Sequence, residues 1–179
     1  VYHEVRRLRE KGKPVLAWAG SVMASGGYYI AAAADEIMAN PTSTVGSIGV
    51  IMQHYQVSDL LEKIGVRVSP ITSGELKDIG SPYREMTPEE RALLQEYIDV
   101  AHRRFVDIVA EGRNMPADKV REVANGGIFD AESAKRLGLV DSVGYIEDAV
   151  AWAARKTGRT GIPVLGDRRL PASAPISAD

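Results

Sequence analysis

The sequence contains no cysteine, and this absence excludes disulfide bonds, thiolate catalysis and cysteine-based metal sites. It also lacks any run of about 18 apolar residues, so we expect no segment that spans a bilayer. Neither sign of charge is in excess, because 22 basic residues stand against 24 acidic ones and the net charge is −2 at pH 7. That balance gives no electrostatic reason to expect nucleic acid or an anionic membrane surface as a partner.

Motifs for bound cofactors are absent as well. The glycine-rich phosphate-binding motif that ends in Gly-Lys-Ser/Thr does not occur, and the three histidines show no metal-ligand spacing. We therefore expect no cofactor, no metal and no dependence on ATP.

The composition that remains is that of a globular protein, with 179 residues, 45% of them hydrophobic, and 17 glycines. It predicts one domain over residues 1–160, followed by a mobile tail at 161–179 that is rich in proline, alanine and serine. No signal peptide opens the chain. Val1–Leu8 has the pattern of an amphipathic helix without an N-cap, so we expect a further segment, folded or membrane-anchoring, upstream.

Short apolar runs between glycine and proline breakers predict an α/β fold. An alanine-rich helix at 28–34 is apolar on nearly every side and is expected in the core. Other expected elements are a helix at 1–11, strands at 15–19, 44–52 and 66–72, a small-residue turn at 20–27, a helix at 58–64, a polar loop at 73–85, and helices at 116–124, 131–137 and 146–157.

The clearest local signal is Thr87-Pro88-Glu89-Glu90. Thr87 is a preferred N-cap, proline suits the first helical position, and Glu90 completes a capping box. A long helix is expected to follow, ending near Gly112. Its apolar face comprises Leu93, Leu94, Tyr97, Ile98, Ala101, Phe105, Ile108 and Val109.

Ser25 is the candidate nucleophile. It lies between an apolar strand and a buried helix, and such a junction exposes a hydroxyl while the helix N-terminus directs N–H groups at developing negative charge. Gly26 and Gly27 allow close approach of a substrate backbone, and the Gly26 N–H can donate to an oxyanion. The alternative is that Ser25 merely caps the helix, as serine often does.

A serine nucleophile requires a base. His3 and His102 lie among charged residues and are expected on the surface. His54 remains an alternative for a Ser-His-Asp triad, although no acidic partner stands out. Lysine can replace histidine if its ammonium is removed from water, which lowers its pKa. Lys77 follows an expected strand, but by default it would be solvated and paired with Glu75 or Asp78.

Ordered blocks of sequence over residues 1–150 resemble the signal peptide peptidase A family, serine peptidase family S49, in its half-length bacterial and archaeal form. The blocks are Met23–Ala31, Asp35–Ile37, Gly46–Val50, Ser73–Pro82, Arg84–Thr87 with Glu89 and Glu90, Gly126–Phe129 and Ala134–Asp141. A lone Ser-Gly-Gly would be a weak signal, whereas these blocks in order with compatible spacing are specific.

The resemblance implies a ClpP/crotonase-like fold of repeated β-β-α units and a serine endopeptidase that cleaves released signal peptides and other hydrophobic or unfolded peptides. It implies that Ser25 is the nucleophile and Lys77 the general base, and that Ser47 lies near the lysine and orients its amine.

In the half-length form the Ser–Lys dyad is completed between subunits of a ring, so the resemblance implies a homo-octamer in which Lys77 serves the Ser25 of a neighbour. It also implies a membrane-associated protein with an extracytoplasmic catalytic domain, attached through an upstream anchor, while the present stretch is itself expected to be soluble. The family's Asn-Ser-Pro-Gly-Gly-like turn, which helps to form the oxyanion hole, is not in this sequence.

Two alternatives remain open. A crotonase-like enzyme acting on acyl-CoA would use the same kind of fold and leave the Ser–Lys pair idle. A non-catalytic subunit could form rings and bind peptides without cutting them.

Overall fold

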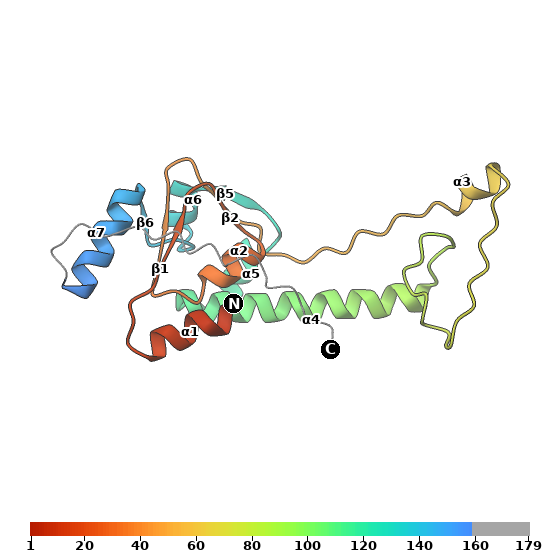
Figure 1. Cartoon of the computed structure of the whole chain (residues 1–179), viewed down its shortest axis with the longest axis horizontal. Coiled ribbons are helices and arrows are strands. Elements are labelled where there is room, and N and C mark those ends of the chain that lie inside the picture. Colours follow the sequence, from red (N-terminus) through yellow and green to blue (C-terminus); the bar gives the residue numbers. More distant parts are fainter. Residues whose placement is uncertain (159–179) are drawn as a thin grey trace, which may run out of the picture.

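The computed structural model describes residues 1–158, and this part of the chain is α/β, as the sequence predicts (Figure 1). The predicted tail at 161–179 and the domain boundary at 160 lie outside the described residues. The helices are α1 (Tyr2–Glu10), α2 (Gly26–Ala31), α3 (Ser58–Lys63), α4 (Pro88–Arg113), α5 (Ala117–Val123), α6 (Ala131–Arg136) and α7 (Ile146–Thr157). The strands are β1 (Leu16–Ala19), β2 (Val22–Ala24), β3 (Glu36–Ala39), β4 (Thr44–Gly46), β5 (Ile128–Asp130) and β6 (Ser142–Val143).

The strands form two three-stranded sheets. In one, β3 lies between β1 and β6 and all pairs are parallel. In the other, β4 pairs in parallel with β2 and antiparallel with β5. The parallel pairing of β2 with β4 matters for the site, because it brings the carboxyl ends of these two strands, at Ala24 and Gly46, side by side.

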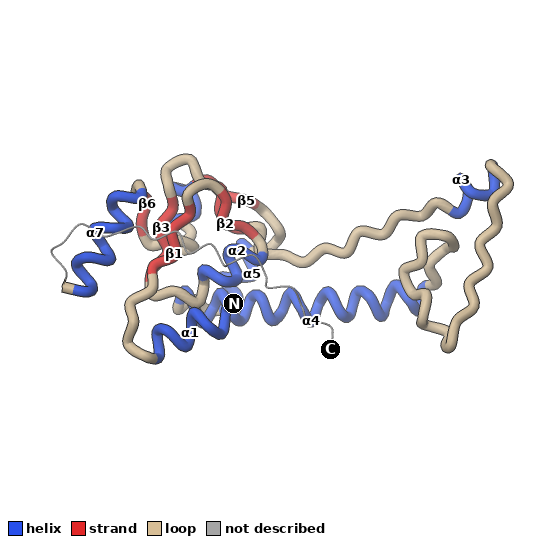
Figure 2. The backbone as a smooth tube through the Cα atoms, viewed as in Figure 1, coloured by secondary structure: helices blue, strands red, loops and turns tan. Residues whose placement is uncertain are grey.

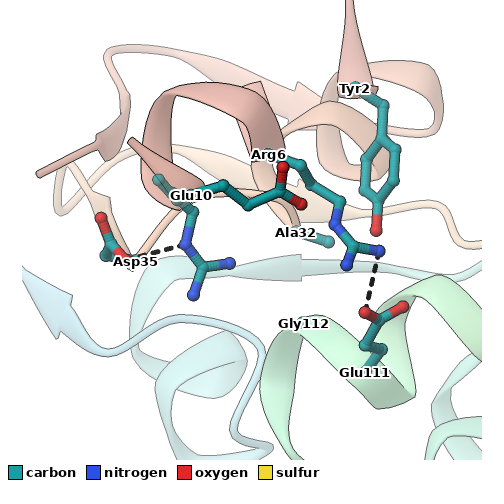
Figure 3. Close-up of a pocket in the computed structure, with 8 residues that line it drawn as sticks. Tyr2, Arg6, Glu10, Ala32, Asp35, Glu111 and Gly112 are labelled. Atoms are coloured by element: carbon teal, nitrogen blue, oxygen red, sulfur yellow. Dashed lines mark hydrogen bonds and ion pairs between the residues drawn. The ribbon is translucent and has the colours of Figure 1, made fainter. Parts of the chain in front are cut away.

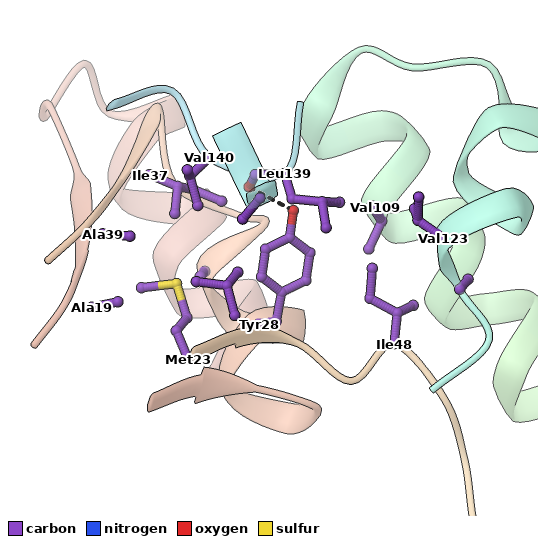
Figure 4. Close-up of a cluster of buried hydrophobic side chains, with 14 of the residues drawn as sticks. Ala19, Met23, Tyr28, Ile37, Ala39, Ile48, Val109, Val123, Leu139 and Val140 are labelled. Atoms are coloured by element: carbon purple, nitrogen blue, oxygen red, sulfur yellow. Dashed lines mark hydrogen bonds between the residues drawn. The ribbon is translucent and has the colours of Figure 1, made fainter. Parts of the chain in front are cut away.

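The core lies between the sheets and the C-terminal half of α4 (Figure 4). Tyr28 of α2 is fully buried there, and its hydroxyl donates a 2.7 Å hydrogen bond to the Leu139 carbonyl. Burial raises the pKa of Tyr28, because ionisation would leave a phenolate without water. The alanine-rich segment is buried as predicted, although α2 ends at Ala31 and residues 32–34 continue as a turn.

An arm, residues 50–87, leaves this body after β4 and returns to the N-terminal end of α4 (Figure 1). Apart from α3, the arm consists of extended chain and turns (Figure 2). The outgoing and the returning chain of the arm are joined by a 2.8 Å hydrogen bond from the Val57 N–H to the Pro82 carbonyl. The arm therefore lies beyond the sheets, at the N-terminal end of α4 (Figure 1).

Several expected elements differ from the structure. The turn predicted at 20–27 contains β2, and the segment after the alanines forms β3. The strand predicted at 44–52 ends at Gly46, because Gly46 and Ser47 have positive φ angles that a regular strand does not contain. No strand forms at 66–72 among the described residues. Val66, Val68 and Ile71 are exposed there, since the arm offers this segment no neighbouring strand.

Candidate active site

Ser25 occupies the sharp turn between β2 and α2. Its φ is 51°, a left-handed conformation that a residue with a side chain adopts only under strain. The turn is held by a 2.8 Å hydrogen bond from the Ser25 N–H to the Gly46 carbonyl and a 2.9 Å bond from the Tyr29 N–H to the Ser25 carbonyl. The hydroxyl does not cap α2, although Ser25 stands at the N-cap position. The alternative of a mere helix cap therefore lacks its hydrogen bond.

The residues after Ser25 leave open space in front of it. Gly26 and Gly27 are exposed, and a Cβ atom added at either position would meet nothing within 4 Å. Their N–H groups belong to the first turn of α2, which has no intrahelical acceptors for them. The strand–turn–helix arrangement expected around Ser25 is thus present, with donors beside the hydroxyl.

Two cavities meet at Ser25. One, of about 500 Å³, is lined by Ser25 and Ser47 together with Val50, Ile51 and the α4 residues Ile98 and His102. The other, of about 350 Å³, is mostly apolar and is lined by Ser25, Gly26, Tyr29, Ile51 and Phe105. The structure therefore brings three of the predicted site residues, Ser25, Gly26 and Ser47, to one place.

Ser47 is also strained, with φ at 49°. Its N–H donates to the Gly127 carbonyl at 2.7 Å, and the Gly126 N–H donates to the Ile48 carbonyl at 3.1 Å. These two hydrogen bonds join the loop before β5 to the segment that carries Ser47, so hydrogen-bonded backbone forms part of the cavity wall.

Lys77 does not join these residues within the chain. It lies on the arm in a turn closed by its own N–H donating to the Gly74 carbonyl at 3.1 Å, and it is exposed. The arm returns at the end of α4 that is remote from the sheets (Figure 1). From Glu90, near that end, the α4 residues lining the Ser25 cavities begin at Ile98, about 12 Å further along the helix axis.

The expected surface ion pair between Lys77 and Glu75 or Asp78 does not form among the described residues. Asp78 instead binds Arg84, with an N–O distance of 2.9 Å. The guanidinium hydrogen bonds hold the pKa of Asp78 below its usual range. Lys77 is thus exposed, as its default interpretation predicts, but the ion pair expected for it is not among those of the described residues.

His54 and His102 do not lie where the sequence predicts them relative to Ser25. His54 lies on the arm, with Nε2 3.2 Å from the Ser81 carbonyl, and does not line the Ser25 cavities. The prediction for His102 as a surface residue is wrong. His102 is half-buried, its Nε2 is 2.8 Å from the Ala124 carbonyl, and its ring lines the larger cavity. Its position one turn before the buried Phe105 was the available signal.

A further cavity, of about 380 Å³, lies between α1, the chain that follows α2, and α4 (Figure 3). Arg6 pairs with Glu111 and Arg9 with Asp35, each at 2.8 Å. Because both arginines are already matched by carboxylates, the charges there require no ligand. Among residues 1–158 no group of acidic and histidine side chains is arranged to hold a metal ion, and no helix is long and apolar enough to cross a membrane.

Comparison with known proteins decides the family. The sequence model of peptidase family S49 matches residues 7–159, most of the chain. The chain belongs to peptidase family S49. It is 48% identical over 158 residues to a protein named as a protease in Synechocystis sp., covering 88% of this chain and 57% of the relative. It is 44% identical over 147 residues to a protein named as a signal peptide peptidase in Enterococcus faecium, covering 82% of this chain and 43% of the relative.

The S49 chain thus spans about half the length of the curated relatives it matches. A solved structure of a membrane-bound stomatin-specific protease superimposes on 82% of this chain and 58% of its own, with a TM-score of 0.49 and 18% identity. Family S49 is a family of serine peptidases, and residues 7–159 of this chain match its sequence model. The resemblance found in the sequence is confirmed at the level of the family.

Proposed function

We propose that this chain is the catalytic part of a serine endopeptidase in which Ser25 is the nucleophile and Lys77 of a neighbouring copy is the general base. The observation that carries the proposal is the Ser25 turn, which is strained, exposed, free of a capping role and open to two cavities. The position of Lys77 on the arm supports a base that acts on another subunit.

The proposed reaction begins when the neutral amine of Lys77 takes the proton of the Ser25 hydroxyl. The oxygen attacks the peptide carbonyl, and the Gly26 N–H donates to the oxyanion that forms. The lysine returns its proton to the leaving amine, which leaves an acyl-enzyme. It then activates the water that releases the acid. The Ser47 hydroxyl, in the same cavity as Ser25, would orient the incoming amine.

A lysine acts as a base only when it is removed from water. Lys77 is exposed in the single chain, so this condition requires a cover that the chain does not supply. Docking of the arm onto a neighbour's Ser25 cavity would bury the amine and bring it to its target in one step. The proposal therefore makes activity depend on assembly.

Exposed apolar side chains support a second copy as the arm's partner. Soluble monomers rarely expose so many large apolar groups together. They gather on the arm and the first half of α4, at Ile51, Met52, Tyr55, Leu60, Ile64, Val66, Val68, Ile71, Leu76, Tyr83, Leu93, Tyr97 and Val100. A head-to-tail contact forms a ring when its rotation closes, and on the basis of the family resemblance we propose a closed ring of eight subunits.

The substrates proposed are hydrophobic peptides, including signal peptides after their release. Val50, Ile51, Tyr29 and Phe105 give the cavities at Ser25 an apolar lining that suits such side chains. The relative from Enterococcus faecium is named as a signal peptide peptidase. We further propose membrane association of the whole protein with the catalytic domain outside the cytoplasm.

The test is covalent labelling with a fluorophosphonate, together with cleavage of a fluorogenic hydrophobic peptide. The unmodified chain should label at Ser25 and cleave the peptide, while Ser25→Ala abolishes both and Lys77→Ala abolishes cleavage. Ser21→Ala and Lys63→Ala, exposed residues of the neighbouring turn and of the arm, are matched controls that should retain both activities. Peptide cleavage by the Ser25→Ala chain would exclude the proposed mechanism. Turnover of an acyl-CoA substrate in place of the peptide would exclude it as well. Peptide binding without cleavage would favour the non-catalytic alternative.

A further inference from the structure

Arg84 stands at the centre of a charged cluster where the arm meets α4. Its Nε and Nη2 donate to the two carboxylate oxygens of Asp78 at 3.0 and 2.9 Å. Its Nη1 donates to Glu90 Oε2 at 2.8 Å, and Nη2 also donates to Glu90 Oε1. Nη1 reaches the Glu85 carbonyl as well, at 3.1 Å. One guanidinium thus grips two carboxylates by paired bonds, which fix direction as well as distance.

Glu90 connects this cluster to the helix. It is the third residue of α4 and forms the capping box with Thr87, through a 3.0 Å bond from the Thr87 N–H to Oε2 and a 3.1 Å bond from the Glu90 N–H to the Thr87 hydroxyl. Its side chain is only 5% exposed. Bonds from Arg84 and from the Thr87 N–H lower the pKa of Glu90 to about 2, so it is a carboxylate throughout the working range.

Asp78 connects the cluster to the general base of the proposed mechanism. It follows Lys77 directly, and its own carbonyl accepts a 2.9 Å bond from the Ser81 N–H and a 3.4 Å bond from Arg84 Nη2. The chain that carries Lys77 is therefore held at both the side chain and the backbone of the next residue. Without Arg84, the ionic link between this turn and α4 would be lost.

We propose that Arg84 is the positioning residue for Lys77, holding the base at a set place on the end of α4. This rests on the proposed function. The same helix lines its own subunit's cavity with Ile98 and His102, so α4 is a rigid spacer between the base that a subunit gives and the nucleophile that it keeps. Lysine could not replace the arginine fully, because an ammonium lacks the planar fork that holds two carboxylates.

The test uses mixed assemblies in which each site has one defined donor of each group. A Ser25→Ala chain supplies only Lys77, and a Lys77→Ala chain supplies only Ser25. Arg84→Met is placed first in the Ser25→Ala chain and then, in a separate mixture, in the Lys77→Ala chain. Arg84→Lys is tested in the same two placements, and Arg7→Met, which removes an exposed Glu4–Arg7 pair on α1, is the matched control. The kcat and KM of peptide cleavage are measured for each mixture.

We expect Arg84→Met in the lysine-supplying chain to lower the recovered kcat by about 10-fold or more with little change in KM, because small displacements of a catalytic group are costly. The same change in the serine-supplying chain should leave kcat within about 2-fold, and Arg84→Lys should show a smaller loss with the same asymmetry. Equal losses in both placements would mean a general structural role, and no loss would mean no role; either overturns the proposal. If the parent pair without any Arg84 change recovers no activity, the shared dyad fails and this proposal falls with it.

Discussion

At the scale of single residues, the conformation of Ser25 separates a nucleophile's turn from an ordinary helix start. A serine that caps a helix has an extended, unstrained backbone, and its side chain bonds an N–H of the first turn. Ser25 instead has φ at 51°, and its side chain does not cap α2. Strain of this kind costs on the order of 1–3 kcal/mol and persists where the surroundings impose it. The fixed turn keeps Ser25 exposed at the start of α2, next to the N–H groups of that helix's first turn.

Ser25→Gly should therefore be more stable than Ser25→Ala, by about 1 kcal/mol, because glycine adopts positive φ without strain. Both variants should be inactive. Urea unfolding of the two chains measures the difference. At Ser21, whose φ is not positive, the same pair of substitutions should give the opposite order, since glycine there only adds freedom to the unfolded chain. A Ser25→Gly chain less stable than Ser25→Ala would contradict the strain.

The residues of the site were only partly predictable from the sequence. Ser25 and Gly26 were found because strand, small-residue turn and helix are adjacent in the chain. The contact of His102 with the cavity was missed, because it depends on which side of α4 faces the loop after α5, and neighbouring arginines suggested solvent. The place of Ser47 beside Ser25 follows from the parallel pairing of β2 with β4, which no local pattern specifies.

At the scale of elements, α4 has the role of joining the arm to the body. Its start was predictable in detail, because a capping box involves only four consecutive residues. Its apolar face was predictable only in the C-terminal half. Phe105, Ile108 and Val109 are buried, whereas Leu93 and Tyr97 are exposed beside the arm. The first half of α4 and the expected strand at 66–72 have an apolar sequence pattern, yet both leave large apolar side chains exposed in this chain.

The cap of α4 should give the fold a measurable dependence on acid. The pKa of Glu90 is lowered from 4.5 to about 2 by Arg84 and the Thr87 N–H, so its ionised form stabilises the folded state above about pH 4.5. That contribution is lost as the pH falls from 4.5 towards 2. Urea unfolding at a series of pH values should show Glu90→Gln less stable than the unmodified chain at pH 7, with the gap narrowing over this window. The exposed neighbour Glu89→Gln is the control, and a gap that is constant with pH would contradict the assignment.

The crossing of α4 with the chain after α2 depends on Gly112. A Cβ atom added there would stand 2.0 Å from the Ala32 carbonyl oxygen, so the backbones would have to separate. Gly112→Ala should lower the free energy of unfolding by about 3 kcal/mol through overpacking. Gly74→Ala, where an added Cβ meets nothing within 4 Å, should change it by less than about 1 kcal/mol in either direction. Equal stability of the two variants would mean that the crossing adjusts freely.

At the scale of the whole molecule, the chain keeps the serine in its body and carries the lysine on its arm. The α/β class was predictable from alternating apolar runs and glycine turns, and membership of family S49 confirms the resemblance. The separation of the two groups could not be read from local pattern, because it is set by where the arm leaves β4 and where it rejoins α4 (Figure 1). The arm carries exposed apolar side chains, which under the proposed function would face another copy.

The most direct test of this account is activity in a mixture of Ser25→Ala and Lys77→Ala chains, each inactive alone, after coexpression or subunit exchange. If Lys77 serves a neighbouring Ser25, an equal mixture should recover about a quarter of the unmodified activity, because each site needs one intact donor of each kind in head-to-tail order. A mixture of Ser21→Ala and Lys77→Ala chains is the reference, because both of its chains keep an intact Ser25. Peptide cleavage that stays at the background of the separate variants, while the mixed assemblies form, would contradict the shared dyad.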